Sequence, residues 1–239
     1  MKITVLKSTV DTSLSIISKI IANAKLPSGT VPMLTIQSDK RNLWIGTTLP
    51  EQQFFITLAD AVYDDKSVAF SVNHEAFRQI ISALHGNHLT LEQEANDLAV
   101  FCDGRKAASL EVYTPIDSAL FVIPSSKDST ILPVNFASFI LQAFSCASTD
   151  QTRKALTGVN VSYRGVAGTD GRQLFYLPLP IQLKESVTLP PSKNYNTLKS
   201  LRWSILEHWK HDDASRMFAI LGENFKYIAK ALEQPYPYY

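Results

Sequence analysis

Apolar and polar residues recur along this chain with two periods, one typical of helices and one typical of strands. Apolar residues spaced by three and four predict two helices in the first half. We expect Ser8 to cap the first helix, with Asp11 in its first turn and Pro27 beyond its end. The second is predicted to start at the cap Asn73 and to end before Gly86. Period-two alternation predicts strands at 1–7, 33–38, 42–48, 52–58, 88–94, 97–102 and 107–114.

The same order of elements starts again in the second half. Pro133-Val-Asn135 opens a third predicted helix, and Ser192 is expected to cap a fourth. Further strands are predicted near 203–208, 215–222 and 225–232. A helix followed by three strands thus occurs four times, at intervals of about 60 residues. The polar segment 125–130 is the predicted boundary, so we expect two domains, 1–124 and 125–239.

Between the third and fourth helices the pattern predicts a two-strand ribbon. Val159, Val161 and Tyr163 alternate with polar residues, as in a half-buried strand. Asp170-Gly171 is a turn dipeptide, because glycine adopts positive φ without a Cβ clash. The pattern alone favours an ordinary hairpin with a solvated tip.

Two arginines and two leucines flank this ribbon. Arg153 and Arg172 are expected at the mouth of a small apolar hollow that contains Leu156 and Leu174. The alternative, which the pattern alone favours, is that both leucines are core residues and Arg153 is a surface charge.

Arg153-x-x-Leu156-x-Gly158 and Thr169-Asp170-Gly171-x-x-Leu174 resemble the second domain of the bacterial sliding clamp, the β subunit of DNA polymerase III. The family typically reads Arg-Tyr-x-Leu-Asn-Gly and Ala-Thr-Asp-Gly-His-Arg-Leu at these places. Arg172 stands where the family usually has His, and Gln173 where it has Arg. In the first half, the order of elements and Ile45-Gly-Thr47 are similar to the first clamp domain.

The resemblance covers essentially the whole chain but only two of the three clamp domains. It implies an α+β fold of two clamp domains, each with two helices packed on antiparallel sheets, whose helices line a hole. The terminal Tyr236-Pro237-Tyr238-Tyr239 resembles the linker to a third domain. We favour a fragment over a protein that does without that domain.

The resemblance also implies two sets of site residues. A pocket for the peptide tails of polymerases, clamp loaders and repair proteins is predicted at Arg153, Leu156, Thr169, Gly171, Arg172, Gln173, Leu174 and Pro237. Sequence-independent contacts to duplex DNA are predicted for Lys19, Lys25, Arg78, Lys154, Lys193, Lys199 and Arg202.

Composition narrows the remaining choices. The 239 residues are 45% hydrophobic with a net charge of +1, an ordinary globular composition with no gross preference for nucleic acid or membrane. No apolar run reaches the roughly 18 residues of a membrane span, and the two cysteines are expected to be buried free thiols in a cytoplasmic protein. The five histidines are expected to be surface or interfacial, so no metal site is predicted. No phosphate-loop or Gly-x-Ser-x-Gly motif occurs, so no cofactor or enzymatic site is predicted either.

Two hypotheses of different classes follow. The chain is a sliding clamp or a two-domain part of one, which tethers polymerase to duplex DNA without catalysing a reaction. Alternatively, it is a clamp-derived module that binds peptides without encircling DNA. Unpaired sheet edges would also favour self-association in a two-domain chain.

Overall fold

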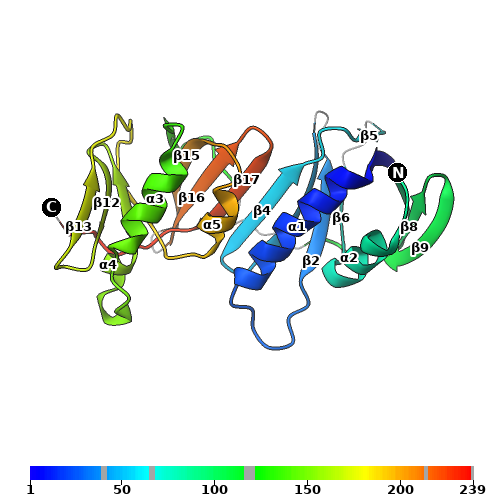
Figure 1. The fold of residues 1–239 in the computed structure, drawn as a ribbon, viewed down its shortest axis with the longest axis horizontal. Coiled ribbons are helices and arrows are strands. Elements are labelled where there is room, and N and C mark those ends of the chain that lie inside the picture. Colours follow the sequence, from blue (N-terminus) through cyan, green and yellow to red (C-terminus); the bar gives the residue numbers. More distant parts are fainter. Residues whose placement is uncertain (39–41, 65–67, 116–121, 213–214, 238–239) are drawn as a thin grey trace. The chain divides into compact units, whose positions relative to one another are not determined.

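The computed structural model describes the chain except for residues 39–41, 65–67, 116–121, 213–214 and 238–239 (Figure 1). The chain divides into two units, Met1–Asp117 and Ser118–Tyr239. The boundary that we predict from the sequence lies a few residues further along, after residue 124, and stays a prediction.

The first unit contains two helices and two antiparallel sheets. Its elements are β1 (Lys2–Leu6), α1 (Lys7–Asn23), β2 (Met33–Ser38), β3 (Leu43–Leu49), β4 (Gln52–Thr57), β5 (Val62–Tyr63), β6 (Val68–Asn73), α2 (His74–Ala83), β7 (His88–Glu94), β8 (Asp97–Cys102) and β9 (Arg105–Glu111). The strands pair in the orders β5-β1-β7-β8-β9 and β4-β3-β2-β6. Helix α1 contacts β1, β3, β4 and α2, whereas α2 contacts β6 and β9.

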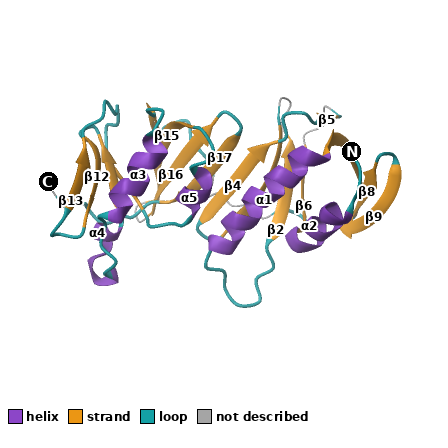
Figure 2. Ribbon diagram, in the orientation of Figure 1, coloured by secondary structure: helices purple, strands orange, loops and turns teal. Residues whose placement is uncertain are grey.

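The second unit repeats this plan. Its elements are β10 (Asp128–Ile131), α3 (Phe136–Ser145), the 3₁₀ turn η2 (Gln151–Arg153), α4 (Lys154–Thr157), β11 (Val159–Ser162), β12 (Gly165–Thr169), β13 (Leu174–Leu177), β14 (Val187–Leu189), α5 (Asn194–Leu198), β15 (Trp203–Asp212), β16 (Ser215–Gly222) and β17 (Phe225–Lys230). The strands pair in the orders β10-β15-β16-β17 and β13-β12-β11-β14. Helix α3 contacts β11, β12, β13 and α5 (Figure 2).

Comparison of the pairing orders shows what is repeated. In the first unit, β1 joins the sheet of β7, β8 and β9, and β6 joins the sheet of β2, β3 and β4. In the second unit, β10 joins the sheet of β15, β16 and β17, and β14 joins the sheet of β11, β12 and β13. The repeated element is therefore a strand, a helix and three strands, and each copy gives its first strand to the other copy's sheet. The predicted α+β fold with antiparallel sheets is confirmed. The strands β5, β6, β10 and β14 were not predicted, and three strands, β11, β12 and β13, form where a two-strand ribbon was expected.

The first helix starts earlier than predicted. Its N-cap is Leu6, which forms no side-chain capping hydrogen bond, so Ser8 already lies inside the helix and does not cap it. Asp11 lies beyond the first turn and forms an ion pair with Lys7, at 2.6 Å from Nζ to Oδ2. The predicted cap of α2 is correct, because the Asn73 side chain accepts a 2.9 Å hydrogen bond from the Ala76 N–H.

The polar segment 125–130 is only partly a connector. Its end, Asp128–Ile131, is strand β10, which pairs with β15. The polar Asp128 fits there because its Oδ2 accepts hydrogen bonds from the backbone N–H groups of Lys184 (2.6 Å) and Glu185 (3.1 Å). Ser192 also differs from the prediction: the N-cap of α5 is Lys193, and the Ser192 hydroxyl accepts a hydrogen bond from the Asn194 N–H.

The predicted ribbon is part of a four-stranded sheet. All four residues of β11, a central strand between β12 and β14, are buried and not alternately exposed, so both faces of the sheet are covered at this strand. Tyr163, predicted as an inward residue, is 63% exposed in the turn after β11. The half-buried pattern was therefore wrong for this strand.

An aromatic cluster fills the core of the second unit. The Tyr195 ring is fully buried and stacks on Phe144 at 5.3 Å between ring centroids. It also contacts Trp203 and Tyr227. Such pairs each add about 1 kcal/mol of stabilisation beyond burial of apolar area.

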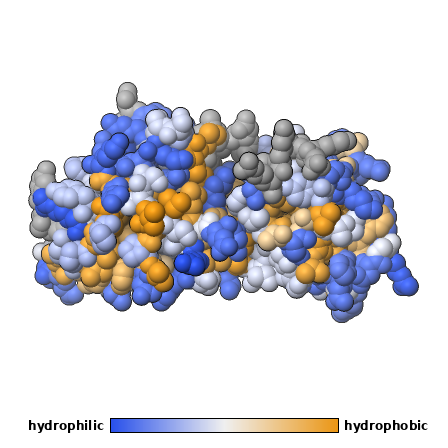
Figure 3. Space-filling model, turned by 90° about the horizontal axis from the view of Figure 1, so that it is seen from above, coloured by the Kyte–Doolittle hydropathy of each residue, from blue (hydrophilic) through white to orange (hydrophobic). Residues whose placement is uncertain are grey.

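On the surface, Figure 3 shows small hydrophobic patches between hydrophilic residues.

Candidate functional site

The turn between β12 and β13 is held by its own side chains. One oxygen of the Asp170 carboxylate accepts hydrogen bonds from the backbone N–H groups of Arg172 (2.7 Å) and Gln173 (2.8 Å). These bonds, first that from Gln173 and then that from Arg172, lower the pKa of Asp170. The Thr169 hydroxyl donates to the Gln173 carbonyl and accepts from the Gly171 N–H. Thr169 therefore orders the turn, and Asp170 has a structural role, as its turn motif predicts.

Gly171 connects this turn with the other half of the sequence motif. Its φ of +90° is a conformation that favours glycine. A Cβ atom at this position would lie 3.2 Å from Nη1 of Arg153 and 3.9 Å from Cδ1 of Leu156. The structure therefore brings Arg153, Leu156 and Gly171 together, although up to 18 positions separate them in the sequence.

Arg153 is oriented by the residue that starts its own turn. Asp150 caps η2: one carboxylate oxygen accepts from the Thr152 hydroxyl (2.7 Å) and N–H (2.9 Å), and the other lies 3.3 Å from Nε of Arg153. These hydrogen bonds, chiefly those from Thr152, lower the pKa of Asp150. Asp150 was missed as a site residue in the sequence, although an Asp two residues before Thr152 is a recognisable capping signal.

Leu174 and Leu156 are not deeply buried. Leu174 is 51% exposed on β13, paired with Thr169, so its interpretation as a core residue is wrong. Leu156 is partly buried on α4, which contacts β12. Arg172 and Gln173, which lie between Gly171 and Leu174 in the sequence, are exposed.

The C-terminal segment meets the opposite edge of the same sheet at Leu232. The Leu232 N–H donates to the Thr188 carbonyl of β14 at 2.9 Å. A Cβ on Gly158 would lie 2.7 Å from Cδ1 of Leu232, which places this segment beside the end of α4. Pro237 follows on the same segment and is exposed. The last two residues of the predicted linker, Tyr238 and Tyr239, lie outside the described residues.

The residues predicted to face DNA divide among several elements. Lys19 is exposed on α1 and Lys25 just beyond it, whereas Lys193, Lys199 and Arg202 are exposed around α5. Lys154 is exposed on α4, directly after Arg153 in the sequence. Within the described part of the chain, none of these six forms an ion pair.

Arg78 on α2 differs from the other basic residues because Glu75 already pairs with it. The Arg78 Nη2 and Nε atoms lie 2.7 and 3.0 Å from the two Glu75 carboxylate oxygens. These hydrogen bonds lower the pKa of Glu75 to about 2. Part of the positive charge of Arg78 is therefore compensated locally.

Two histidines are buried, contrary to the prediction that all five lie at the surface or an interface. His74 is 5% exposed, with Nε2 3.0 Å from the Ser18 hydroxyl oxygen, and burial lowers its pKa. His208 is also 5% exposed, with Nε2 3.1 Å from Oδ2 of Asp128. Each histidine thus links two elements of its unit.

The cysteines match the prediction in part. Both are free thiols, with Cys102 buried and Cys146 partly exposed. Over the described ranges, no group of three or more His, Cys, Asp or Glu side chains is arranged to hold a metal ion. No helix there is long and apolar enough to cross a membrane.

Comparisons with known proteins add one decisive observation. No family model matches the sequence, and no curated protein matches it. Solved structures do match: the Helicobacter pylori beta clamp bound to a DNA ligase peptide aligns with 100% of this chain and 68% of that chain, at a TM-score of 0.76 and 19% identity. The chain has the β-clamp fold.

Clamps of other bacteria give the same result. The DNA polymerase sliding clamp from Bacillus subtilis aligns with 100% of this chain and 66% of its own, with a TM-score of 0.76 and 14% identity. The β subunit from Streptococcus pyogenes gives a TM-score of 0.73 at 15% identity, again over 100% and 66%. The chain thus spans about two thirds of the length of these clamps, equivalent to two of their three domains. The predicted resemblance to the clamp fold is confirmed.

Proposed function

We propose that this chain acts as a DNA sliding clamp, or as a two-domain part of one, in the manner of a DNA polymerase III β subunit. It is a non-catalytic cytoplasmic processivity factor that tethers polymerase, clamp-loader and repair-protein peptides to duplex DNA. The supporting observation is that, within a β-clamp fold, Arg153 and Leu156 lie against the Gly171 turn, and Leu174, three residues further along the chain, is exposed. A peptide partner is also supported by the DNA ligase peptide bound to the Helicobacter pylori clamp.

The side chains of the proposed peptide site have different roles in binding. Leu156 and Leu174 supply apolar contact area, and Arg153, oriented by Asp150, supplies hydrogen-bond donors at the edge. Because Gly171 has no side chain, it leaves open the space beside Arg153 and Leu156. A side chain at position 171 would approach Arg153. Gln173 and Pro237 border the same region in the proposed site.

The test is a titration of a fluorescent DNA ligase peptide, followed by anisotropy. Saturable binding is expected for the wild type. Leu174→Asp places a charge in the apolar site and should weaken binding by at least about 2 kcal/mol, roughly thirtyfold. Ile131→Asp is the matched control, since Ile131 is 82% exposed on β10 and outside the site. Equal affinity of wild type and Leu174→Asp would place the site elsewhere.

The proposed DNA role rests on exposed basic residues. Lys19, Lys25, Lys193, Lys199 and Arg202 are exposed on or beside helices and make no ion pair among the described residues. As phosphate contacts, they would bind any sequence and lose affinity steeply with salt.

The second candidate, a peptide-binding module that does not encircle DNA, is favoured by the local compensation of Arg78. Retention on a closed circular plasmid, compared with its linearised form, separates the two. A clamp assembled around DNA is retained on the circle and slides off the line. Equal retention on both, or none, would support the module. Light scattering over a concentration series would show whether the chain self-associates.

A further inference from the structure

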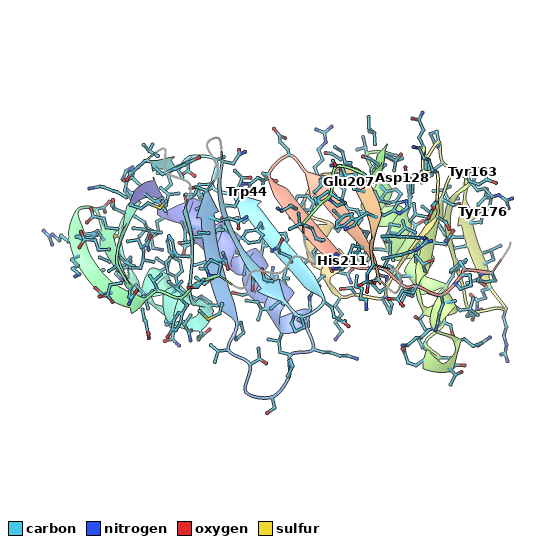
Figure 4. All side chains as sticks on the ribbon, turned by 180° about the vertical axis from the view of Figure 1, so that it is seen from behind. Trp44, Asp128, Tyr163, Tyr176, Glu207 and His211 are labelled. Carbon is cyan, nitrogen blue, oxygen red and sulfur yellow. The ribbon has the colours of Figure 1, made fainter. Side chains whose placement is uncertain are left out.

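The end of helix α3 supports both halves of the proposed peptide site. One half is the turn after β12, which contains Gly171, and the other is the η2–α4 segment, which carries Arg153 and Leu156. Helix α3 contacts β11, β12 and β13, the sheet near which Figure 4 labels Tyr163 and Tyr176. A different contact connects the end of α3 to each half.

On the side of β12, the backbone of α3 lies directly on the strand. Ala143, near the end of α3, is fully buried, and Gly168 of β12 lies against it. A Cβ atom on Gly168 would overlap the carbonyl oxygen of Ala143 and lie 2.7 Å from its carbonyl carbon. Glycine therefore permits this close approach, directly before Thr169 and the turn that Thr169 orders.

On the side of α4, the contact is made by Ser148, which follows the end of α3. The Ser148 N–H donates to the Leu156 carbonyl at 2.8 Å, and the Ser148 hydroxyl oxygen accepts from the Asp150 N–H at 3.1 Å. The second bond closes a turn in which a serine hydroxyl accepts from the backbone two residues further on. Ser148 is 8% exposed, so water competes little for these two bonds.

Asp150, which Ser148 holds, is also the residue that orients Arg153. Its Oδ2 atom lies 3.3 Å from Nε of Arg153, and its carbonyl accepts from the Arg153 N–H at 3.1 Å. The side chains of this ion pair are 53% and 44% exposed, so the pair alone holds the guanidinium weakly. Ser148 therefore supplies the buried anchor that the exposed pair lacks.

We propose that Ser148 is a positioning residue of the peptide site. It holds residues 149–157 against the end of α3, so that Arg153 and Leu156 occupy their binding positions before a peptide arrives. Such ordering reduces the conformational entropy that is lost on binding. Ser148 acts through Asp150 and Arg153, without contact to the peptide. This inference rests on the proposed peptide-binding function and adds to it a residue outside the pocket that the sequence predicts.

The first test compares the affinity of the fluorescent DNA ligase peptide for the wild type and for Ser148→Ala. Loss of the hydroxyl removes the acceptor of the Asp150 N–H and should weaken binding about fivefold. Ser148→Thr, which keeps the hydroxyl, should bind within about twofold of the wild type. A folded Ser148→Thr that binds as weakly as Ser148→Ala would overturn the role of the hydroxyl.

Ser145→Ala is the matched control for Ser148→Ala. Ser145 is an exposed serine on α3, and its hydroxyl donates to the Gln142 carbonyl of the same helix at 2.7 Å. Its replacement should leave peptide affinity unchanged. Equal affinities of Ser148→Ala and Ser145→Ala would overturn the proposal.

A double-mutant cycle distinguishes the positioning of Arg153 from a general loss of structure. Arg153→Ala should weaken peptide binding about tenfold. Ser148→Ala added to it should cause no more than about a twofold further loss, because the side chain that Ser148 positions is then absent. A further loss as large as in the wild-type background would show that Ser148 does not act through Arg153, and would overturn the proposal.

Hydrogen exchange measured by mass spectrometry gives a readout that needs no peptide. In Ser148→Ala, the backbone of residues 149–157 should exchange faster than in the wild type, whereas exchange in α1 should not change. Unchanged exchange in 149–157 would overturn the proposal. If no peptide binds the wild type, the proposed function fails and the positioning role fails with it. If the wild type and Ser148→Ala bind the peptide equally well, the inference alone fails and the proposed function stands.

Discussion

Replacement of Gly171 by Ala should separate stability from peptide binding. Gly171 has a φ of +90°, so an alanine there is strained by about 1 to 2 kcal/mol. Its Cβ would also lie 3.2 Å from Nη1 of Arg153, a contact that the end of a flexible side chain relieves by moving. The movement separates Arg153 from Asp150, whose exposed ion pair contributes little to stability. The main cost in unfolding free energy is therefore the backbone strain.

Gly104→Ala is the matched control. Gly104 has a φ of +80°, and a Cβ at this position would meet no atom within 4 Å, so the variant carries the same strain without a neighbour to displace. Urea unfolding should give similar losses of about 1 to 2 kcal/mol for both variants. Only Gly171→Ala should weaken the ligase peptide, by about fivefold, because it shifts Arg153 and narrows the space beside Leu156. Equal peptide affinities for the two variants would refute the role given to Gly171 and Arg153.

Two further predictions concern the buried polar pairs. Burial lowers the pKa of His74 below the 6.5 of the unfolded chain. The contribution of neutral His74 to stability is therefore present above pH 6.5 and is lost as pH falls through the folded pKa. Between pH 8 and 5, the urea midpoint should decline less in His74→Gln than in the wild type, and parallel curves would contradict this. Asp128→Ala leaves His208 and the backbone N–H groups of Lys184 and Glu185 without their acceptor. Calorimetry should therefore show a loss of at least about 2 kcal/mol in unfolding free energy. Asp97→Ala, at an exposed position, is the control and should change the unfolding free energy little.

The sequence predicts the larger elements of this fold because their signals are local. The apolar spacing in α1, the Asn73 cap of α2 and the period-two strands of the first unit depend on neighbouring residues only. The exchange of first strands between the two sheets has no such signal, because partners such as Asp128 and His208 are 80 positions apart. This is why the local pattern indicates a connector at β10 and a surface position for His208.

The site was predictable only in part, for a similar reason. The spacing of Thr169-Asp170-Gly171 indicates a turn, and the structure contains one. That Arg153 lies against this turn depends on how α4 packs on β12, which neither segment encodes alone. The exposure of Tyr163 was missed because the alternation continues to Tyr163, whereas β11 ends at Ser162 and Tyr163 lies in the turn that follows.

Photo-crosslinking would locate the bound peptide most directly. The ligase peptide would carry a benzophenone at an apolar position, and mass spectrometry would identify the residues it labels in the intact chain. Labelling should fall within 150–157 and 169–177, around Arg153, Leu156 and Leu174, and should be competed by unlabelled peptide. Competed labelling confined to the first unit, or to other strands of the second, would contradict the assignment of this site and of the clamp function built on it.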